Sequence, residues 1–391
     1  MRETHSVGDC PLSEGFDIII VGAGIVGAAC AEACAEAGHK VLVLDRGPVG
    51  AGSTGAAMGH IVVMDDSAEQ LALTHYSRRL WNERATELPA DVEYQQCGTL
   101  WVAADEEEMR AVRSKVAVFQ KEGIQVEAVD ASELHTLEPA LNSELVGGLL
   151  VPEDAVLYPP TAARFLLEQA QARGTALRLG VTVQTLLPGG GVTLSDGETL
   201  SAGLVVNAAG CAAPLLSAGL PVQRRKGHLL ITDRYPGTVR HQLVELGYLK
   251  SASGVVTDSV AFNVQPRANG QLLIGSSRQY GNESRAIDPD ILQRMLKRAR
   301  RYLPELGRLS AIRTWVGFRP ATPDKQPFIG PSLASDRIWL ATGHEGLGVT
   351  TSLATARIIV DLIAGRRPDI PAEPYLPARL AKGTARNNLE F

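Results

Sequence analysis

Residues 16–45 read FDIIIVGAGIVGAACAEACAEAGHKVLVLD, and this stretch decides the fold. FDIIIV is a short apolar run typical of a buried parallel strand, and VLVLD is a second one. The alanine-rich segment between them, closed by Gly38, predicts a helix. A right-handed crossover would lay the two strands side by side with the helix on one face. The stretch therefore predicts the first strand–helix–strand unit of an α/β fold.

A glycine pattern of the form G-x-G-x-x-G joins the first strand to the helix. Gly22 permits a tight turn, Gly24 lets the backbone approach a pyrophosphate, and Gly27 lets the helix pack close to the strand. Asp45 ends the second strand, where a carboxylate can accept both hydroxyls of a ribose. Strand, glycines, helix and acid together predict a dinucleotide site.

The same kind of buried strand followed by glycines returns in the middle and near the end of the chain, while mixed strands and amphipathic helices fill the gaps. This alternation predicts one nucleotide domain in three segments and a second domain inserted twice. We expect the nucleotide domain at 15–66, 150–220 and 316–370, the substrate domain at 67–149 and 221–315, and terminal extensions at 1–14 and 371–391.

Composition narrows the function classes. The 391 residues include 38 Lys and Arg against 43 Asp and Glu, a net charge of −5, which argues against a nucleic-acid partner. Five widely spread cysteines without a C-x-x-C pair indicate neither a disulfide framework nor a metal site. No signal-peptide core and no transmembrane segment is evident, so we expect a cytoplasmic protein.

A loop rich in small residues follows Asp45 and runs to His60. Its glycines, alanines and two hydroxyls suit a loop lying flat against a large planar cofactor. Here the sequence resembles the flavin-dependent D-amino-acid oxidase superfamily, in its glycine oxidase and sarcosine oxidase branch, from Phe16 to about Gly365. The resemblance implies a Rossmann-like FAD-binding domain of the glutathione-reductase type, with an inserted mixed-sheet α+β substrate domain.

Three later segments carry the same resemblance. Residues 204–210 (LVVNAAG) are similar to the strand beside the pyrophosphate, although Cys211-Ala212 replaces the usual Trp-Ser. Residues 180–183 (GVTV) look like the strand that meets the adenine, through Val183 or Val181. Residues 341–351 (ATGHEGLGVTT) resemble the last flavin loop, whose helix N-terminus would stabilise negative charge on the reduced flavin.

The resemblance implies a set of FAD-binding residues. They are Gly22, Gly24, Ile25, Val26, Gly27, Asp45, Arg46, Ser53, Thr54, Ala57, Met58, Gly59, Val183, Ala208, Ala209, Gly210, Gly343, Glu345, Gly346, Leu347, Gly348, Val349 and Thr350. Sarcosine oxidases attach flavin through a late cysteine; this chain has none after Cys211, so we expect FAD to be non-covalent.

The segment GFRPATPD at 317–324 is similar to a family signature whose arginine binds the substrate carboxylate. A planar guanidinium grips a carboxylate through two parallel hydrogen bonds, so Arg319 is the candidate clamp, with an ion pair to Asp324 as the structural alternative. His344 and His60 are further candidate catalytic residues, and for His344 a role in setting polarity is favoured over proton transfer. Trp101 and Tyr248 are candidate pocket walls.

The predicted function is FAD-dependent oxidation of the C–N bond of a small amino acid or secondary amine, by hydride transfer to flavin N5, with an imine product that hydrolyses. Oxygen, a quinone or a partner subunit would accept the electrons. Two fragments, MGHIVVMDD and GHEGLGVTTS, look closest to D-hydroxyproline dehydrogenases and the hydrogen cyanide synthase catalytic subunit. The alternatives are an electron-relay flavoprotein subunit and an NAD(P)-dependent dehydrogenase; oligomeric state stays open.

Overall fold

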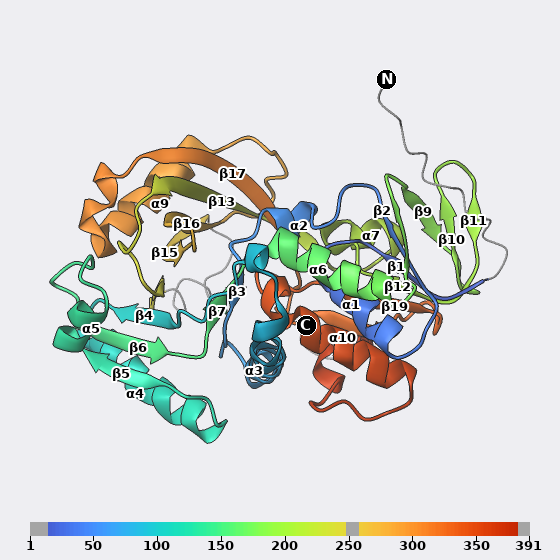
Figure 1. The fold of residues 1–391 in the computed structure, drawn as a ribbon, viewed down its shortest axis with the longest axis horizontal. Coiled ribbons are helices and arrows are strands. Elements are labelled where there is room, and N and C mark those ends of the chain that lie inside the picture. Colours follow the sequence, from blue (N-terminus) through green and yellow to red (C-terminus); the bar gives the residue numbers. More distant parts are fainter. Residues whose placement is uncertain (1–14, 248–257, 382–391) are drawn as a thin grey trace, which may run out of the picture.

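The computed structural model describes residues 15–247 and 258–381, and within them two large sheets lie at opposite ends of the molecule (Figure 1). The first has six strands: β1 (Phe16–Val21), β2 (Val41–Asp45), β8 (Ala176–Leu179), β12 (Ala202–Asn207), β18 (Phe328–Pro331) and β19 (Ile338–Thr342). Their order is β18-β19-β12-β1-β2-β8, and all neighbours are parallel except β18 and β19. This arrangement confirms the predicted α/β class.

Strand β1 is buried on both faces. Because side chains alternate along a strand, Ile18 and Ile20 enter the core on one face, and Ile19 and Val21 enter the core on the other. The first face is covered by three helices, α1 (Ile25–Glu36), α6 (Pro159–Ala172) and α10 (Gly348–Ile363) (Figure 1). The second is covered by a small antiparallel sheet of β9 (Val183–Leu186), β10 (Val192–Leu194) and β11 (Thr199–Leu200).

Helix α1 lies between α6 and α10 and is almost wholly buried. Its alanines and the two thiols Cys30 and Cys34 are small enough for both neighbours to approach closely. Their complete burial is typical of thiols that pack as small apolar side chains.

The second large sheet has eight strands within the same residues. They are β4 (Thr99–Ala103), β5 (Glu127–Asp130), β6 (Gly147–Val151), β13 (Gln223–Arg234), β14 (Gln242–Glu245), β15 (Ser259–Pro266), β16 (Gln271–Arg278) and β17 (Ala311–Ala321). The order is β17-β13-β16-β15-β14-β4-β6-β5, antiparallel except between β14 and β4. It is the predicted mixed sheet.

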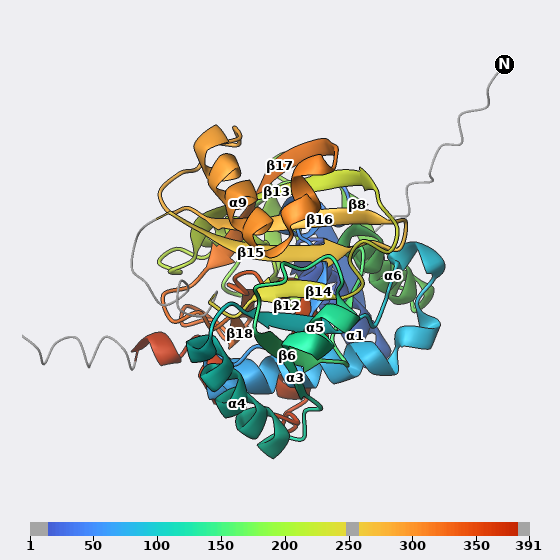
Figure 2. The same ribbon diagram turned by 90° about the vertical axis from the view of Figure 1, so that its left-hand side faces the viewer.

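Three helices accompany this sheet: α4 (Glu106–Lys121), α5 (Ala131–Leu137) and α9 (Pro289–Tyr302) (Figure 2). Asp130 caps α5 and exchanges hydrogen bonds with Glu133, as a capping box requires. The basic helix α9 buries Ile291, Met295 and Ala299 against the sheet, and its other arginines are exposed, whereas Arg298 pairs with the buried Glu245. In the described residues no helix is long and apolar enough to cross a membrane.

The predicted domain limits stay a proposal, which the strands and helices refine. Strand β6 runs to Val151 and β17 to Ala321, so the second sheet overruns the predicted limits at 150 and 316. Helix α3 (Ala68–Glu83), placed by the prediction in the substrate domain, packs against α10. Its buried Trp81 donates a hydrogen bond to the Val349 carbonyl at 3.2 Å. We therefore assign α3 to the nucleotide domain.

The residues after 370 also pack against this domain. Tyr375, in a short 3₁₀ turn, is buried and donates a hydrogen bond to the Glu69 carbonyl at 2.6 Å. Arg379 pairs with Asp324 at 2.6 Å and lies over the ring of Phe328. Up to residue 381, the predicted extension is thus part of the fold.

Candidate active site

A cavity of about 870 Å³ is lined by residues of both large sheets, and we call it the central pocket. On one side are the ends of β1, β2 and β12, the starts of α1 and α10, and the loop that contains α2 (Gly52–Gly55). On the other side is one face of the eight-stranded sheet. Arg319, His344 and His60, the three predicted catalytic residues, all line it, as does Trp101. Tyr248 lies outside the described residues.

The predicted cofactor residues also line the pocket, with three exceptions. Gly27 packs α1 against the preceding turn, because a Cβ there would lie 3.0 Å from the carbonyl carbon of Gly22. Gly343 makes a turn with a φ of +81°. Thr350 is fully buried and donates a hydrogen bond to the His60 carbonyl at 2.8 Å. These three residues shape segments that line the pocket, without lining it themselves.

The start of α1 faces the pocket with little side-chain cover. Gly22 has a φ of +119°, and a Cβ there would lie 2.5 Å from the Ala208 carbonyl oxygen, so the turn requires glycine. Gly24 is the N-cap residue and offers no capping side chain. Thr54, from the α2 loop, accepts a hydrogen bond from the Ile25 N–H at 3.0 Å. The helix dipole and the other first-turn N–H groups favour an anion here.

Asp45 is held by the backbone at the end of β2. Its carboxylate accepts hydrogen bonds from Ala23 N at 2.7 Å and from Gly47 N at 2.8 Å. An ionised carboxylate has about four acceptor positions, so both oxygens keep capacity for hydroxyl donors. Val181 and Val183 line the pocket close by, with Val181 N donating to the Asp45 carbonyl at 3.1 Å.

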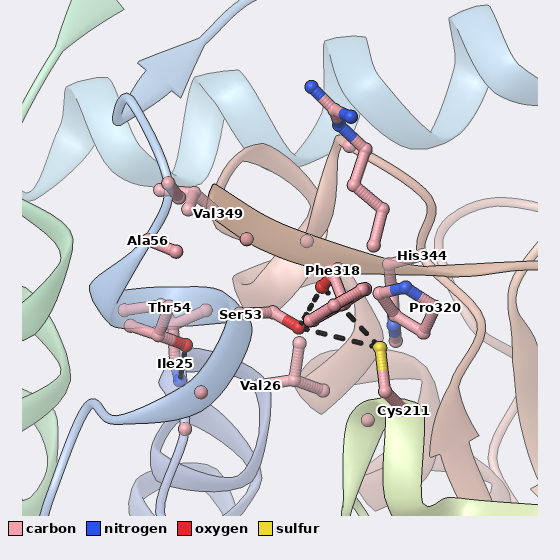
Figure 3. Close-up of a pocket in the computed structure, with 18 of the residues that line it drawn as sticks. Ile25, Val26, Ser53, Thr54, Ala56, Cys211, Phe318, Pro320, His344 and Val349 are labelled. Atoms are coloured by element: carbon pink, nitrogen blue, oxygen red, sulfur yellow. Dashed lines mark hydrogen bonds between the residues drawn. The ribbon is translucent and has the colours of Figure 1, made fainter. Parts of the chain in front are cut away.

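Ser53 ties the α2 loop to β17. Its hydroxyl donates to the Phe318 carbonyl at 2.6 Å, and the Cys211 thiol donates to the same oxygen at 3.4 Å (Figure 3). Cys211 occupies the position where the family usually has tryptophan, and burial raises the pKa of its thiol. The three segments that border this part of the pocket are therefore joined by one carbonyl oxygen.

Arg319 extends across the sheet from β17 to β16. It pairs in register with Arg225 of β13, and its Nη1 donates to the Ser277 carbonyl at 3.0 Å. To do so it passes over Gly227, where a Cβ would lie 2.8 Å from the Arg319 Cζ. Gly346, before α10, approaches the same side chain from the opposite wall. The predicted alternative partner, Asp324, pairs with Arg379.

His344 is neutral and its tautomer follows from its partner. Burial lowers the pKa of His344 to about 3. The Thr355 hydroxyl donates its single proton to the Thr351 carbonyl at 2.8 Å, so it accepts at 3.0 Å from His344 Nε2. This network assigns the proton to Nε2 and leaves Nδ1 as an acceptor.

His60 is neutral as well. Burial, aided by the positive charge of Arg319, lowers the pKa of His60 to about 3. Its Nε2 is buried and has no hydrogen-bond partner among the described residues. Neither histidine therefore accepts a proton near neutral pH, which favours polarity-setting roles for both.

Comparison with known proteins agrees with this geometry. Residues 17–362 match the family model described as FAD dependent oxidoreductase (DAO). The chain belongs to this family. The predicted superfamily and the FAD cofactor are thereby confirmed.

Three similar proteins illustrate the family. D-amino acid dehydrogenase of Dechloromonas aromatica is 27% identical, with 92% of this chain and 99% of that protein covered. Hydrogen cyanide synthase subunit HcnC of Pseudomonas aeruginosa is 27% identical, with 94% and 97% covered. The crystal structure of glycine oxidase from Geobacillus kaustophilus superimposes with a TM-score of 0.84 at 24% identity, covering 94% and 99%, and supports the fold alone.

The pocket of this FAD-dependent oxidoreductase fits its cofactor. Two helices, α1 and α10, begin at the pocket with no capping side chain at either N-cap residue. The residues at the start of α1 and Asp45 would hold the pyrophosphate and ribose, and those at the start of α10 would hold the flavin.

Several pocket residues of this oxidoreductase were missed by sequence reasoning. Arg225 forms an ion pair with Glu345, and Arg278 lines the pocket from β16. Burial raises the pKa of Glu345, although the charges of Arg225, Arg319 and Arg278 oppose the shift. The sequence QRRKGHLL could have indicated Arg225, because alternation along a strand places Arg225 and Gly227 on the same face.

Two carboxamides were also missed. Gln242 of β14 and Asn263 of β15 line the pocket, and each is less than a tenth exposed. Their side-chain oxygens are buried without a hydrogen-bond partner among the described residues. Buried acceptors without donors are costly, so this wall is suited to a ligand that brings N–H groups.

Proposed function

We propose that this oxidoreductase oxidises the C–N bond of a small amino acid or secondary amine, and that Arg319 holds the substrate carboxylate. The observation that carries the proposal is the placement of Arg319, whose guanidinium lies on the pocket wall over Gly227, opposite the start of α10. The names of the D. aromatica and P. aeruginosa relatives support an amine or amino-acid substrate.

Bound FAD supplies a two-electron acceptor. The protein's part is to place the substrate against it. Arg319 fixes the carboxylate, and the oxygens of Asn263 and Gln242, which have no hydrogen-bond partner within residues 15–247 and 258–381, accept the N–H groups of the amine. His344, neutral with a bare Nδ1, and His60 keep the site polar without adding positive charge. Backbone N–H groups at the start of α10 would favour negative charge on the bound cofactor.

The electron acceptor is oxygen, a quinone or a partner subunit. A relative, HcnC, is named as a subunit, and this name supports a partner subunit as the electron acceptor in that related protein. Aerobic reoxidation of the substrate-reduced protein, with and without a soluble quinone, separates oxygen from the other two.

An anaerobic absorbance titration tests the proposal. The panel holds glycine, sarcosine, D-alanine, D-proline, D-hydroxyproline, L-proline and a simple amine without a carboxylate. We expect the amino acids to bleach the flavin band and the plain amine to leave the band unchanged. In Arg319→Met the amino acids should lose this advantage over the plain amine. A yellow protein that no member bleaches would rule out a small amino-acid substrate.

A further inference from the structure

One row of paired residues crosses the pocket face of the eight-stranded sheet. Gly275 of β16 pairs with Asn263 of β15, Asn263 pairs with Val244 of β14, and Val244 pairs with Trp101 of β4. Residues that pair in register point to the same face of a sheet, and the last three of these residues all line the central pocket. The row therefore changes from polar to apolar in the direction from β16 to β4.

The apolar part of this row continues into a buried cluster. Val244 and Trp101 pack in one hydrophobic cluster with Val62 and Met64, and Leu347 packs against that cluster from the start of α10. All five residues line the central pocket, and we call them its apolar end. Because Val244, Trp101, Val62 and Met64 are each less than a tenth exposed, this end of the pocket is a recess in the core.

The spacing of the strands relates the apolar end to the proposed carboxylate site. The Arg319 guanidinium is held at β16, where its Nη1 donates to the Ser277 carbonyl at 3.0 Å. Neighbouring strands lie about 4.8 Å apart, so across the sheet β15 is about 5 Å, β14 about 10 Å and β4 about 14 Å from β16. A carboxylate on Arg319 and an amine at Asn263 use only the first of these spacings.

The α-carbon substituent of such a substrate therefore lies towards β14 and β4. A methyl group ends one bond from the α-carbon and stays near Asn263. A chain of three or more carbons, or an aromatic ring, extends over Val244 and Trp101 and removes their apolar surface from water, which is favourable.

The cofactor does not account for the sheet side of this recess. The residues suited to the dinucleotide lie at the starts of α1 and α10, in the domain of the six-stranded sheet, whereas Val244 and Trp101 belong to the eight-stranded sheet. Leu347 is the member of the apolar end that borders the proposed flavin site, so a substrate in the recess would lie beside the flavin.

We propose that the substrate of this enzyme is an amino acid with an apolar side chain of three or more carbons, bound against Val244 and Trp101. This inference rests on the proposed amino-acid oxidation and specifies its substrate class. Arg319 and Asn263 would hold the two polar groups that all amino acids share, and the apolar end would select among their side chains.

The test uses side chains of increasing length on the FAD-loaded protein. The series is alanine, 2-aminobutyrate, norvaline and leucine in both enantiomers, with asparagine as a polar counterpart of leucine of similar shape. We expect kcat/KM of one enantiomer to rise about fourfold for each methylene from alanine to norvaline. Leucine should exceed asparagine at least about tenfold, because burial of an amide without a partner is costly.

A pair of matched variants assigns the preference to Val244. Val244→Thr keeps the shape and adds a hydroxyl to the recess, so the ratio of leucine to asparagine should fall at least about fivefold. Val264→Thr is the control. Val264 is also fully buried, but it follows Asn263 on β15 and faces the core on the other side of the sheet, so this variant should keep the ratio.

Binding without turnover gives a second readout. Acetate and 4-methylpentanoate share the carboxylate and differ in the apolar chain, and each can be titrated against the flavin spectrum. We expect 4-methylpentanoate to bind more tightly than acetate, and Val244→Thr to reduce the difference.

The outcomes separate the two proposals. Flavin that alanine reduces as efficiently as norvaline and leucine would overturn the apolar side chain and leave the proposed function standing. A ratio of leucine to asparagine that survives in Val244→Thr, or falls equally in Val264→Thr, would overturn the assignment of Val244. Flavin that no amino acid of this series or of the first panel reduces would overturn both proposals.

Discussion

Replacing Gly227 by alanine is expected to disable the carboxylate clamp without unfolding the protein. The new Cβ would lie 2.8 Å from both Cζ and Nη2 of Arg319, and closer still to Nη1. Ordinary contact begins at 3.4 Å, so Cζ and Nη2 have to retreat by about 0.6 Å and Nη1 by more, and the guanidinium loses its position over the pocket. The backbone at Gly227 is a regular strand, and only the flexible end of one side chain is displaced.

The magnitude follows from the bond that is lost. A hydrogen bond to a charged group contributes about 1.5–3 kcal/mol, which corresponds to a fall in kcat/KM of about 10- to 150-fold. Steady-state kinetics with the best amino acid of the panel measures this, while the melting temperature and FAD content should stay near the wild-type values. Gly189→Ala is the control, because a Cβ there meets nothing within 4 Å. Unchanged kcat/KM in Gly227→Ala would refute the role given to Arg319.

Three further predictions concern the cofactor, pH and stability. Asp45→Asn leaves one of two backbone N–H donors without an acceptor and should raise the Kd for FAD at least about tenfold by fluorescence titration, whereas Asp17→Asn at an exposed site should not. The pKa values of His344 and His60 are lowered from 6.5 to about 3, so between these two pH values the unfolded chain binds more protons than the folded chain. These two groups therefore destabilise the fold as the pH falls from 6.5 towards 3. The urea midpoint of His344→Gln should for that reason depend less steeply on pH than that of the wild type. Arg78→Leu removes the ion-pair partner of Asp154, whose side chain is fully buried, and urea unfolding should show a loss of about 3–5 kcal/mol in the free energy of unfolding.

Local sequence predicted the nucleotide half of the molecule well. The run from Phe16 to Asp45 forms β1, α1 and β2 as expected, because a buried parallel strand and a glycine turn each leave a pattern in consecutive residues. The same holds for the loops before α2 and α10. Our prediction of the domains grouped α3 with the substrate domain, whereas the structure packs it against α10, since an amphipathic stripe shows that a helix packs but not against which element.

The pocket residues that come from the eight-stranded sheet were harder to predict. Arg225, Arg278, Asn263 and Gln242 come from four strands, and no motif joins them in the chain. Their meeting depends on strand order and register, because a shift of one residue would turn each of them to the other face.

The sequence by itself therefore determined that a dinucleotide is bound, since a dinucleotide is held largely by backbone turns and helix starts that neighbouring residues encode. The family resemblance of further contiguous segments named FAD and made Arg319 the candidate carboxylate ligand. Only the tertiary structure decided what lies around that arginine: the glycine it passes over, the carbonyl that holds it, and the two further arginines beside it. The proposed recognition of the substrate depends on side chains from separate strands of one sheet, and the pairing of those strands is a property of the folded chain.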